Sequence, residues 1–543
     1  MITRFTNIRR IDPTQPDSGA LAELFIDHQK IVVDIPRGSL PDRTIDMDGC
    51  YALPGGIDLH THIGGGKVNL ARLLMQEHLT QGMADDRGPL WSSEVTGRKY
   101  ASMGYTACFE PAMLLPQARA THLQLADTPH LDSGAYVVMG NEDWLLRALG
   151  QGLESQVLQE LVRWTVSASR ALAVKVVNAA GIDAFKYHQQ PLDVDQPHVA
   201  YGVTPRMVIR ELSAAVDEIG LAHPLHVHAS NLGMPGNILA TLATLDAADG
   251  RRLHLTHAQF NCYTDTGPFR MGSGAALLAE RLNRSPELSL DVGQIVFGQT
   301  VTLSADAAAQ FRNSRHARPA KSIIADVECV GGCGIVPMKY ESRQYVSSLQ
   351  WTIGLELLLL IRNPYQVLLT TDHPNGGPFT SYPHLIRLLM DRTFRQQMIG
   401  MLHPLVAENC LLRELDREYT LDEIAILTRA APARLLGLDQ RGHLRPGGIA
   451  DVVFYRPQAD WEATFREAHS VWKGGQEIMR SGQVTAHAPQ QRLWAETCRD
   501  ARLPGRFREA IEQTLCMPAA ALELREDEFA EPVTSWLEQA RRA

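Results

Sequence analysis

Short apolar runs, each followed by a longer helical stretch, alternate along most of the chain between residues 53 and 420. Each run ends in polar residues or glycine, as the strands of a parallel barrel do where their carboxyl ends meet the loops of a site. This pattern predicts an α/β barrel. The runs that carry it are YTACFE (105–110), ALAVKVVNAAG (171–181), HPLHVHASN (223–231), RLHLTHAQF (252–260), ELSLDVGQIVF (287–297) and YQVLLTTDHPN (365–375).

The two ends of the chain show a different pattern. Residues 1–52 alternate apolar and polar positions and are broken by Pro and Gly, which is typical of short strands. An amphipathic helix begins the segment 421–489, and further short strands with Gly-containing turns follow it. We therefore predict one discontinuous β domain built from both ends. Residues 490–543 read as a charged helical tail that caps the fold, contacts another subunit or forms a solvated surface helix.

Composition narrows the class of protein. The 543 residues are 45% hydrophobic and 21% charged, which is typical of an ordinary globular chain with a large core. The net charge is −9 and no basic run stands out, so nucleic acid is excluded as a partner. No stretch of 18 apolar residues and no signal peptide is found, so we expect no membrane association and a cytoplasmic enzyme.

The cysteines do not form a recognisable framework. Eight of them are spread thinly and no C-x-x-C occurs, which favours reduced thiols over disulfides or a cysteine-bound cluster. Cys329 and Cys333 form a C-x₃-C pair in a Gly-rich stretch. We interpret that stretch as a loop over the barrel mouth that contacts substrate and does not bind metal.

Candidate metal ligands begin at the first apolar run, LPGGIDLHTHIGGG (53–66). Side chains two apart on a strand share a face, so His60 and His62 are expected to point to one spot. The glycines at 64–66 leave room beside them for a metal or substrate. Lys175 lies inside an apolar run, where it either reaches a carboxylate or reacts with carbon dioxide to form an anionic carbamate ligand.

Two later runs carry paired histidines. His226 and His228 share a face, whereas His254 and His257 are three apart, so only one of that pair can face a site. We choose His228 and His257 because each lies nearer its strand end, and we expect the other two to be supporting or core histidines. Asp372 follows the last run and could bind a metal and exchange a proton. Together, these side chains suit two zinc ions and the hydrolysis of an amide.

Two of the motifs resemble those of the amidohydrolase superfamily. They are GGIDLHTH (55–62) and the C-terminal segment that leads back into the β domain, TRAAPARLLGL…RGHLRPGGIADVVFY (428–455). The resemblance implies a distorted (β/α)₈ TIM-type barrel with a composite β-sandwich domain. It also implies a binuclear zinc site bridged by carboxylated Lys175. His60 and His62 would bind one zinc and His228 and His257 the second, with Asp372 as ligand and general base.

A closer resemblance is to the family of A-type subunits of formylmethanofuran dehydrogenase, through HASNLGMPGN (228–237) and TTDHPNGGPFTSYP (370–383). NAAG at 178–181 indicates the bacterial branch, whose alpha subunit works in a formyltransferase/hydrolase complex of methylotrophs. The resemblance implies N-formylmethanofuran or methylofuran as carrier substrate, partner subunits of B, C and D type, and a pterin-linked formyl carrier served by the formyltransferase subunit. Candidates for substrate contacts or for structural amides are Asn178, Asn231 and Gln294.

Two other functions remain open from the sequence. One is a stand-alone cyclic amidase of the dihydropyrimidinase type, and the other is a scaffold subunit that has lost catalysis. The full set of candidate ligands argues against a scaffold, because a discarded site has no physical reason to keep every one of them.

Overall fold

The computed structural model describes residues 1–35, 40–75, 90–189, 192–304, 325–326, 334–498 and 501–525. Cys329, Cys333 and the last residues of the tail therefore lie outside the described residues. Within the described part, no helix is both long and apolar enough to cross a membrane.

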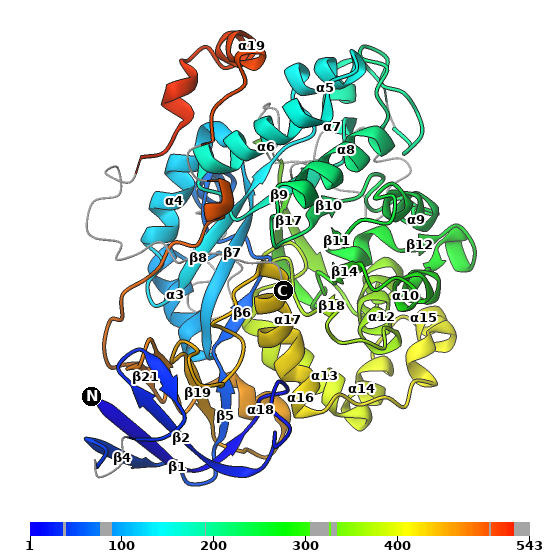
Figure 1. Ribbon diagram of the computed structural model, residues 1–543. Helices are drawn as coiled ribbons and strands as arrows, with labels where there is room; N and C mark the ends of the chain where they lie inside the picture. The colour runs from blue at the N-terminus through cyan, green and yellow to red at the C-terminus, as the bar shows by residue number, and fades with distance from the viewer. Residues whose placement is uncertain are drawn as a thin grey trace.

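Eight parallel strands form the centre of the molecule (Figure 1). Their carboxyl ends point the same way, and the Thr61–His373 bridge joins the segments that follow the first and last strands. The predicted α/β barrel is confirmed. The strands are β6 (Gly56–Asp58), β7 (Tyr105–Met113), β8 (Asp132–Val138), β9 (Ala173–Val177), β10 (Leu225–His228), β11 (Leu253–Leu255), β14 (Leu288–Asp291) and β18 (Val367–Leu368).

Helices surround these strands and bury their apolar faces against them. Helix α12 coincides with the most apolar stretch of the sequence and is buried on nearly all sides, Glu356 included. The helices are α1 (Gly66–Leu74), α3 (Ser93–Ser102), α4 (Ala118–Ala126), α5 (Asp143–Gly150), α6 (Ser155–Ser169), α7 (Gly181–Lys186), α8 (Pro205–Glu218), α9 (Ile238–Asp246), α10 (Ala275–Asn283), α12 (Tyr345–Leu360), α13 (Tyr382–Met390), α14 (Arg392–Ile399) and α15 (Pro404–Asn409).

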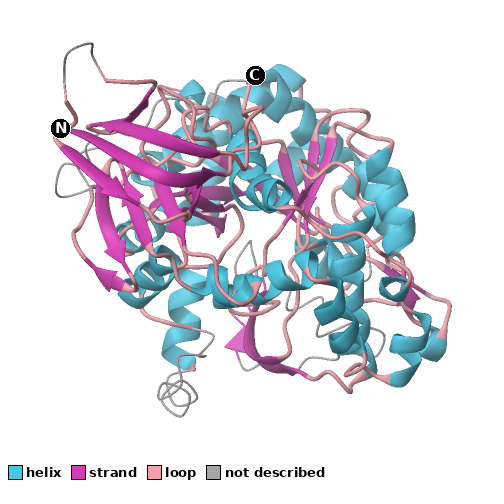
Figure 2. Cartoon of the chain, turned by 90° about the horizontal axis from the view of Figure 1, so that it is seen from below, coloured by secondary structure: helices cyan, strands magenta, loops and turns pink. Residues whose placement is uncertain are grey.

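A nine-stranded sheet is built from both chain ends and lies beside the barrel (Figure 2). The N-terminal strands are β1 (Ile2–Arg10), β2 (Leu21–Asp27), β3 (Lys30–Val32), β4 (Arg43–Asp46) and β5 (Tyr51–Pro54), and the C-terminal strands are β19 (Val452–Tyr455), β20 (Ser470–Lys473), β21 (Gln476–Arg480) and β22 (Gln483–Val484).

This sheet curls back on itself. A bridge between Lys30 and Ile449 joins the edge strand β3 to the segment before β19. The two halves enclose a core of their own, in which Phe5 packs on Phe454 and Trp472 at ring distances of 4.8 and 5.0 Å. The sheet is therefore sandwich-like, as expected from its two separate stretches of sequence, while the domain limits at residues 52, 420 and 489 stay a prediction.

The predicted amphipathic helix near residue 421 forms as α16 (Leu421–Ala425) and α17 (Ala431–Leu436), joined by a π turn at Ile426–Ala430. A capping box between Thr420 and Glu423 starts it, and Gly437 in the left-handed conformation ends it. The shorter elements are α18 (Trp461–Arg466), the hairpin β12 (Tyr263–Thr264) and β13 (Gly272–Ser273), and the small sheet of β15 (Gly298–Ser304), β16 (Ala325–Asp326) and β17 (Gly334–Tyr340).

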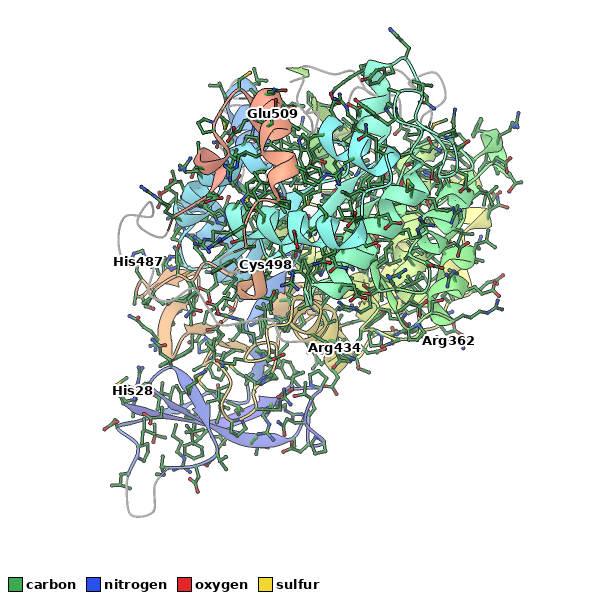
Figure 3. The ribbon with its side chains drawn as sticks, turned by 45° about the horizontal axis from the view of Figure 1, so that its top comes forward. His28, Arg362, Arg434, His487, Cys498 and Glu509 are labelled. Carbon is green, nitrogen blue, oxygen red and sulfur yellow. The ribbon has the colours of Figure 1, made fainter. Side chains whose placement is uncertain are left out.

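The described part of the tail packs against the barrel. Residues 491–493 run beside the start of β8, with Leu493 N–H donating to the Ser133 carbonyl at 2.8 Å. Helix α19 (Gly505–Leu515) follows and sets Phe507 against Trp144 of α5. In Figure 3, Glu509 of α19 lies at the far end of the molecule from His28, in the turn between β2 and β3. The described part of the tail thus packs on the barrel, and its role stays a prediction.

Candidate metal centre

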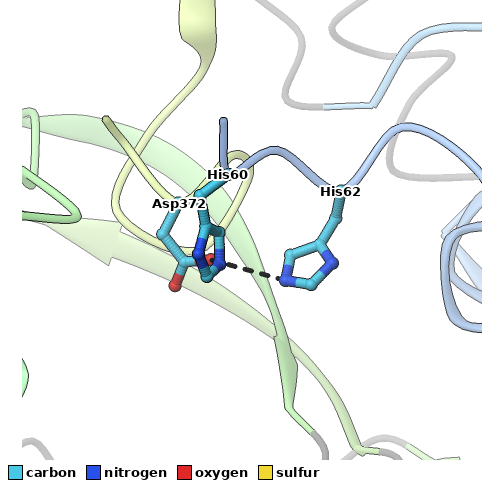
Figure 4. A group of neighbouring side chains, drawn as sticks. All are labelled: His60, His62 and Asp372. Atoms are coloured by element: carbon cyan, nitrogen blue, oxygen red, sulfur yellow. Dashed lines mark ion pairs between the residues drawn. The ribbon is translucent and has the colours of Figure 1, made fainter. Parts of the chain in front are cut away.

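Both histidines of the first motif face one carboxylate. His60 and His62 come just after β6, and Nε2 of each lies near Asp372 Oδ1, at 2.9 and 3.4 Å (Figure 4). The shared direction does not come from a strand, because β6 ends at Asp58. It comes from the bridge that ties the intervening Thr61 to His373, which turns both rings inward. These three side chains can hold one metal ion.

The glycines at 64–66 were expected to leave room beside the histidines, but two of them pack closely against another segment. A Cβ on Gly65 or Gly66 would meet Thr121 or Gln117, from the start of α4 and the turn before it. The glycines therefore allow the loop to pack closely against that segment, and they do not leave open space beside the histidines.

The remaining candidates converge on the same cavity from the next strands of the barrel. Lys175 is the third residue of β9, His228 is the last residue of β10, and His257 follows β11. The cavity has a volume of about 40 Å³, and its lining includes Lys175, His62, His228, His257 and Asp372. His226 and His254 lie outside its lining and are fully buried below it.

The metal-binding character of this cluster rests on buried atoms without partners. In the described part of the chain, four nitrogen and oxygen atoms of the cluster are buried and make no hydrogen bond: His60 Nε2, His228 Nε2, His257 Nδ1 and Asp372 Oδ1. Buried polar atoms normally find a partner. Imidazole nitrogens and carboxylate oxygens are the ligands that zinc prefers, so the residues present fit a zinc centre.

Two ligand candidates are held in unusual backbone conformations. His257 and Asp372 have φ values of 35° and 47°, in the left-handed region that non-glycine residues rarely adopt. Gly293 lies between them, and a Cβ there would come within 2.5 Å of the His257 Cβ. Glycine at 293 therefore allows both side chains to approach the same point.

Lys175 is poised to lose its proton. Its pKa is lowered to about 8, mainly by burial and in part by the nearby ammonium of Lys67, against the opposing effect of Asp372. Lys67 was not singled out in the sequence; it lies in the first turn of α1, immediately after the glycines, and lines the cavity. A neutral lysine amine is the form that reacts with carbon dioxide.

Two carboxylates that sequence reasoning missed support the histidines. Glu110 in β7 accepts from His62 Nδ1 at 2.8 Å and from the backbone N–H of Ile63 and Gly64. Asp291 at the end of β14 accepts from the His257 N–H and from the Thr370 hydroxyl. Both follow apolar runs in the sequence, which is the same signal that identified Asp372.

The electrostatics keep the acids charged. Burial alone would raise the pKa of Asp372 and of Asp291, but His60 and the neighbouring histidines hold both well below the ordinary aspartate value. Burial lowers the pKa of His228 well below 6.5 and that of His257 to about 4, so both rings are neutral and each keeps a lone pair for a metal.

The three predicted amides do not line the cavity. Asn178 follows β9, and its backbone N–H donates to the His228 carbonyl. The Asn231 side chain donates to Asp193 at 3.1 Å, and the Gln294 amide nitrogen donates to the carbonyls of Ile295 and Trp351. Gln294 thus has a structural use, and a substrate role for these residues stays a prediction.

Side chains that could bind a metal lie at the carboxyl ends of the barrel strands, beside a sheet made from both chain ends, and this arrangement is typical of a class of barrel hydrolases. Residues 43–479 match the Amidohydrolase family, and the chain belongs to it. It is 43% identical to the A-type subunit of the formyltransferase/hydrolase complex Fhc of Methylorubrum extorquens, over 96% of this chain and 97% of that protein. It is 34% identical to protein FwdA of Methanocaldococcus jannaschii, over 87% of each.

A solved structure agrees with these matches. The crystal structure of the FhcABCD complex of Methylorubrum extorquens with methylofuran contains a chain that superimposes with a TM-score of 0.91 at 40% identity, covering 100% of both chains. The expected family is therefore confirmed.

Proposed function

We propose that this chain hydrolyses the formamide bond of N-formylmethanofuran, or of its analogue with methylofuran, to formate and the free amine cofactor. The observation that carries the proposal is the set of buried ligand atoms that gather at the cavity without making hydrogen bonds. The 43% identity to a component of a formyltransferase/hydrolase complex supports a formamide over the cyclic amides of dihydropyrimidinase-like enzymes. The intact ligand set argues against a scaffold.

The protein groups would hold two zinc ions. His60, His62 and Asp372 would bind one, His228 and His257 the second, and the carbamate of Lys175 would bridge both. The carbamate forms when the neutral Lys175 amine attacks carbon dioxide, with a C–N bond made and a proton released. When bound, the ions would polarise the formyl oxygen and lower the pKa of a water to about 7, from about 15.7 in bulk.

The reaction adds one water to the C–N bond, R–NH–CHO + H₂O giving R–NH₂ + HCOOH. Asp372 is charged, as its lowered pKa requires. As the general base of the proposed reaction, it accepts the proton of the attacking water and passes it to the leaving amine nitrogen. Lys67 lines the same cavity and supplies a positive charge for the formate carboxylate that results. Formate and amine can recombine by the same steps in reverse.

We further propose that the chain works with B, C and D type subunits, since its relative belongs to a complex with those partners. A pterin-linked formyl carrier would then be the source or acceptor of the formyl group through the formyltransferase subunit.

The test is to purify the full chain with whatever co-elutes, to measure zinc per chain, and to assay formate release from an N-formylated furan cofactor. Near two zinc per chain with formate release is expected. Turnover of hydantoin or dihydrouracil without formate release would overturn the formamide assignment, and a folded chain without zinc would overturn the metal centre.

A further inference from the structure

Three buried histidines form a column that runs down from the candidate metal centre. His60 Nδ1 lies 2.9 Å from His226 Nε2, and His226 Nδ1 lies 3.0 Å from His223 Nε2. All three residues are 0% exposed. The metal centre, as proposed above, uses only the upper end of this column, at His60 Nε2.

The surroundings of His60 Nδ1 decide which atom carries the proton. Besides His226, Nδ1 faces Thr256 Oγ1 at 2.6 Å and Asp291 Oδ2 at 3.4 Å. A charged carboxylate can only accept a hydrogen bond. Nε2 lies 2.9 Å from Asp372 Oδ1 but makes no hydrogen bond to it. We therefore place the proton on Nδ1, and Nε2 can offer its lone pair on the side of Asp372.

The hydrogen bonds further down the column run in the same direction, from donor above to acceptor below. A neutral imidazole has one donor and one acceptor nitrogen. In the described part of the chain neither His226 nor His223 is ion-paired with a carboxylate, and burying an unpaired imidazolium is costly, so both rings are neutral. His226 Nε2 accepts from His60, so its Nδ1 donates to His223 Nε2.

The last proton then lies on His223 Nδ1. The backbone of Leu435 interacts with His223, although the contact is looser than a regular hydrogen bond. A peptide carbonyl, like a carboxylate, can only accept a hydrogen bond. Asp291 at the upper end and the Leu435 carbonyl at the lower end therefore favour the same direction of donation, from His60 through His226 to His223.

We propose that His226 and His223 are positioning residues: His226 accepts a hydrogen bond from the Nδ1–H of His60, and His223 accepts one from His226 and so keeps His226 in that orientation. Nε2 of His60 is thereby left to face the metal. The proposal rests on the zinc centre proposed above. With the opposite polarity, His60 would carry its proton on Nε2, where the metal has to bind. Although His60, His226 and Asp291 also approach one another closely enough for a metal, the His60–His226 hydrogen bond already occupies that space.

The strand neighbour of His226 has no such role. His254 lies beside it in register on β11, but its nitrogens pair with Ser289 at 2.9 Å and with Asp291 at 3.2 Å. It therefore steadies Asp291 and makes no bond to a candidate ligand histidine.

The test compares zinc affinity, by competition with a chelator, among variants of the full chain. H226L removes the acceptor, whereas H226Q keeps an oxygen near the position of Nε2. We expect H226L to bind zinc about 10- to 100-fold more weakly and H226Q to recover most of that loss. The matched control is H122L, because His122 is equally buried but bonds to the Ser169 carbonyl away from the cavity.

Equal zinc affinity of H226L and wild type would overturn the proposal, and so would an equal loss in H226Q and H226L or in H122L. Should H226L not fold, H223L and H223Q make the same comparison one link further from the metal, with a smaller expected loss and the same outcomes. A wild-type chain that binds no zinc would instead refute the proposed metal centre.

Discussion

Two clusters of buried charged groups in this molecule differ in how far their polar atoms are paired within the chain. The first joins the barrel to the sheet of the chain ends, and in it Asp132 of β8 accepts from Lys473 at 2.7 Å, from the Gln491 N–H and from Arg441. Arg441 also pairs with Asp451. Each charged head group lies against an opposite charge, as a buried ion network requires, although Arg441 Nε makes no hydrogen bond. This cluster needs nothing from outside the chain.

The second cluster is the candidate metal centre, and several of its buried polar atoms make no hydrogen bond. His228 Nε2 and His257 Nδ1 are about as deeply buried as the groups of the first cluster, yet they make no hydrogen bond in the described part of the chain. Leaving such atoms unsatisfied costs about 1 to 3 kcal/mol each. Buried charge therefore does not mark a functional site by itself, and neither does a single buried atom without a partner; several atoms of metal-ligand type that gather at one cavity without hydrogen bonds do indicate one.

The largest expected effect is on the metal centre. Lys175→Ala removes the proposed bridging ligand and should abolish formate release, and a small carboxylic acid should restore part of it by taking the place of the carbamate. The check is an activity assay with and without the added acid. Full activity without it would show that Lys175 is not a ligand.

Asp372→Asn should leave most of the zinc bound but remove the proton acceptor. We expect formate release to fall by about a hundredfold to ten-thousandfold, which is the usual contribution of general acid–base catalysis. Zinc per chain and turnover are measured on the same sample. An Asp372→Asn variant that is fully active would refute the proton-transfer role.

Asp132→Ala breaks the satisfied cluster and should affect stability alone. Removing one partner of a buried ion network costs about 3 to 5 kcal/mol of unfolding free energy, measured by urea denaturation. Zinc bound per folded chain should stay at the wild-type value. Loss of zinc from folded Asp132→Ala protein would mean that the two clusters are not independent.

Zinc removal should act on the second cluster only. A ligand at 100 to 1,000 times its dissociation constant stabilises the folded state by about 2.7 to 4.1 kcal/mol, so chelation should lower the unfolding free energy of the wild type by a similar amount. The Lys175→Ala variant should respond less. An identical response of the two proteins would contradict the role of Lys175 in metal binding.

The smallest effect concerns a third buried acid. Burial raises the pKa of Glu356 in α12 to about 7, although the Ser273 hydroxyl and the Leu411 N–H both donate to it. The folded state therefore holds a proton that the unfolded state releases near pH 4.5. Unfolding free energy should fall as the pH rises between about 4.5 and 7, and Glu356→Gln should remove that decline. Parallel pH profiles of the two proteins, measured by urea denaturation, would contradict this.

Much of the candidate site could be predicted because strand ends are visible in the sequence. Apolar runs that end in His or Asp indicate side chains at one edge of a parallel sheet, and the cavity is indeed lined by His228, His257 and Asp372. Choosing His228 over His226 depended on distance from the strand end, and the structure places only the nearer residue in the cavity. Their binding of metal stays a prediction.

Other features could not be predicted because they depend on contacts between distant segments. Lys67 reaches the cavity from a helix. Glu110 and Asp291 follow apolar runs as Asp372 does, but the sequence does not show which histidines they contact. Asn231 belongs to one of the motifs that suggested the family, yet its side chain donates a hydrogen bond to Asp193 and does not line the cavity.

The sequence by itself determined the barrel, the discontinuous sheet and the types of side chain at the strand ends, because hydrophobic periodicity is a local property of the chain. Only the tertiary structure decided which of those groups share a cavity, which are satisfied by partners and which atom of His60 is free to bind. Barrel closure brings residues hundreds of positions apart to within hydrogen-bonding distance, and no local pattern records those distances.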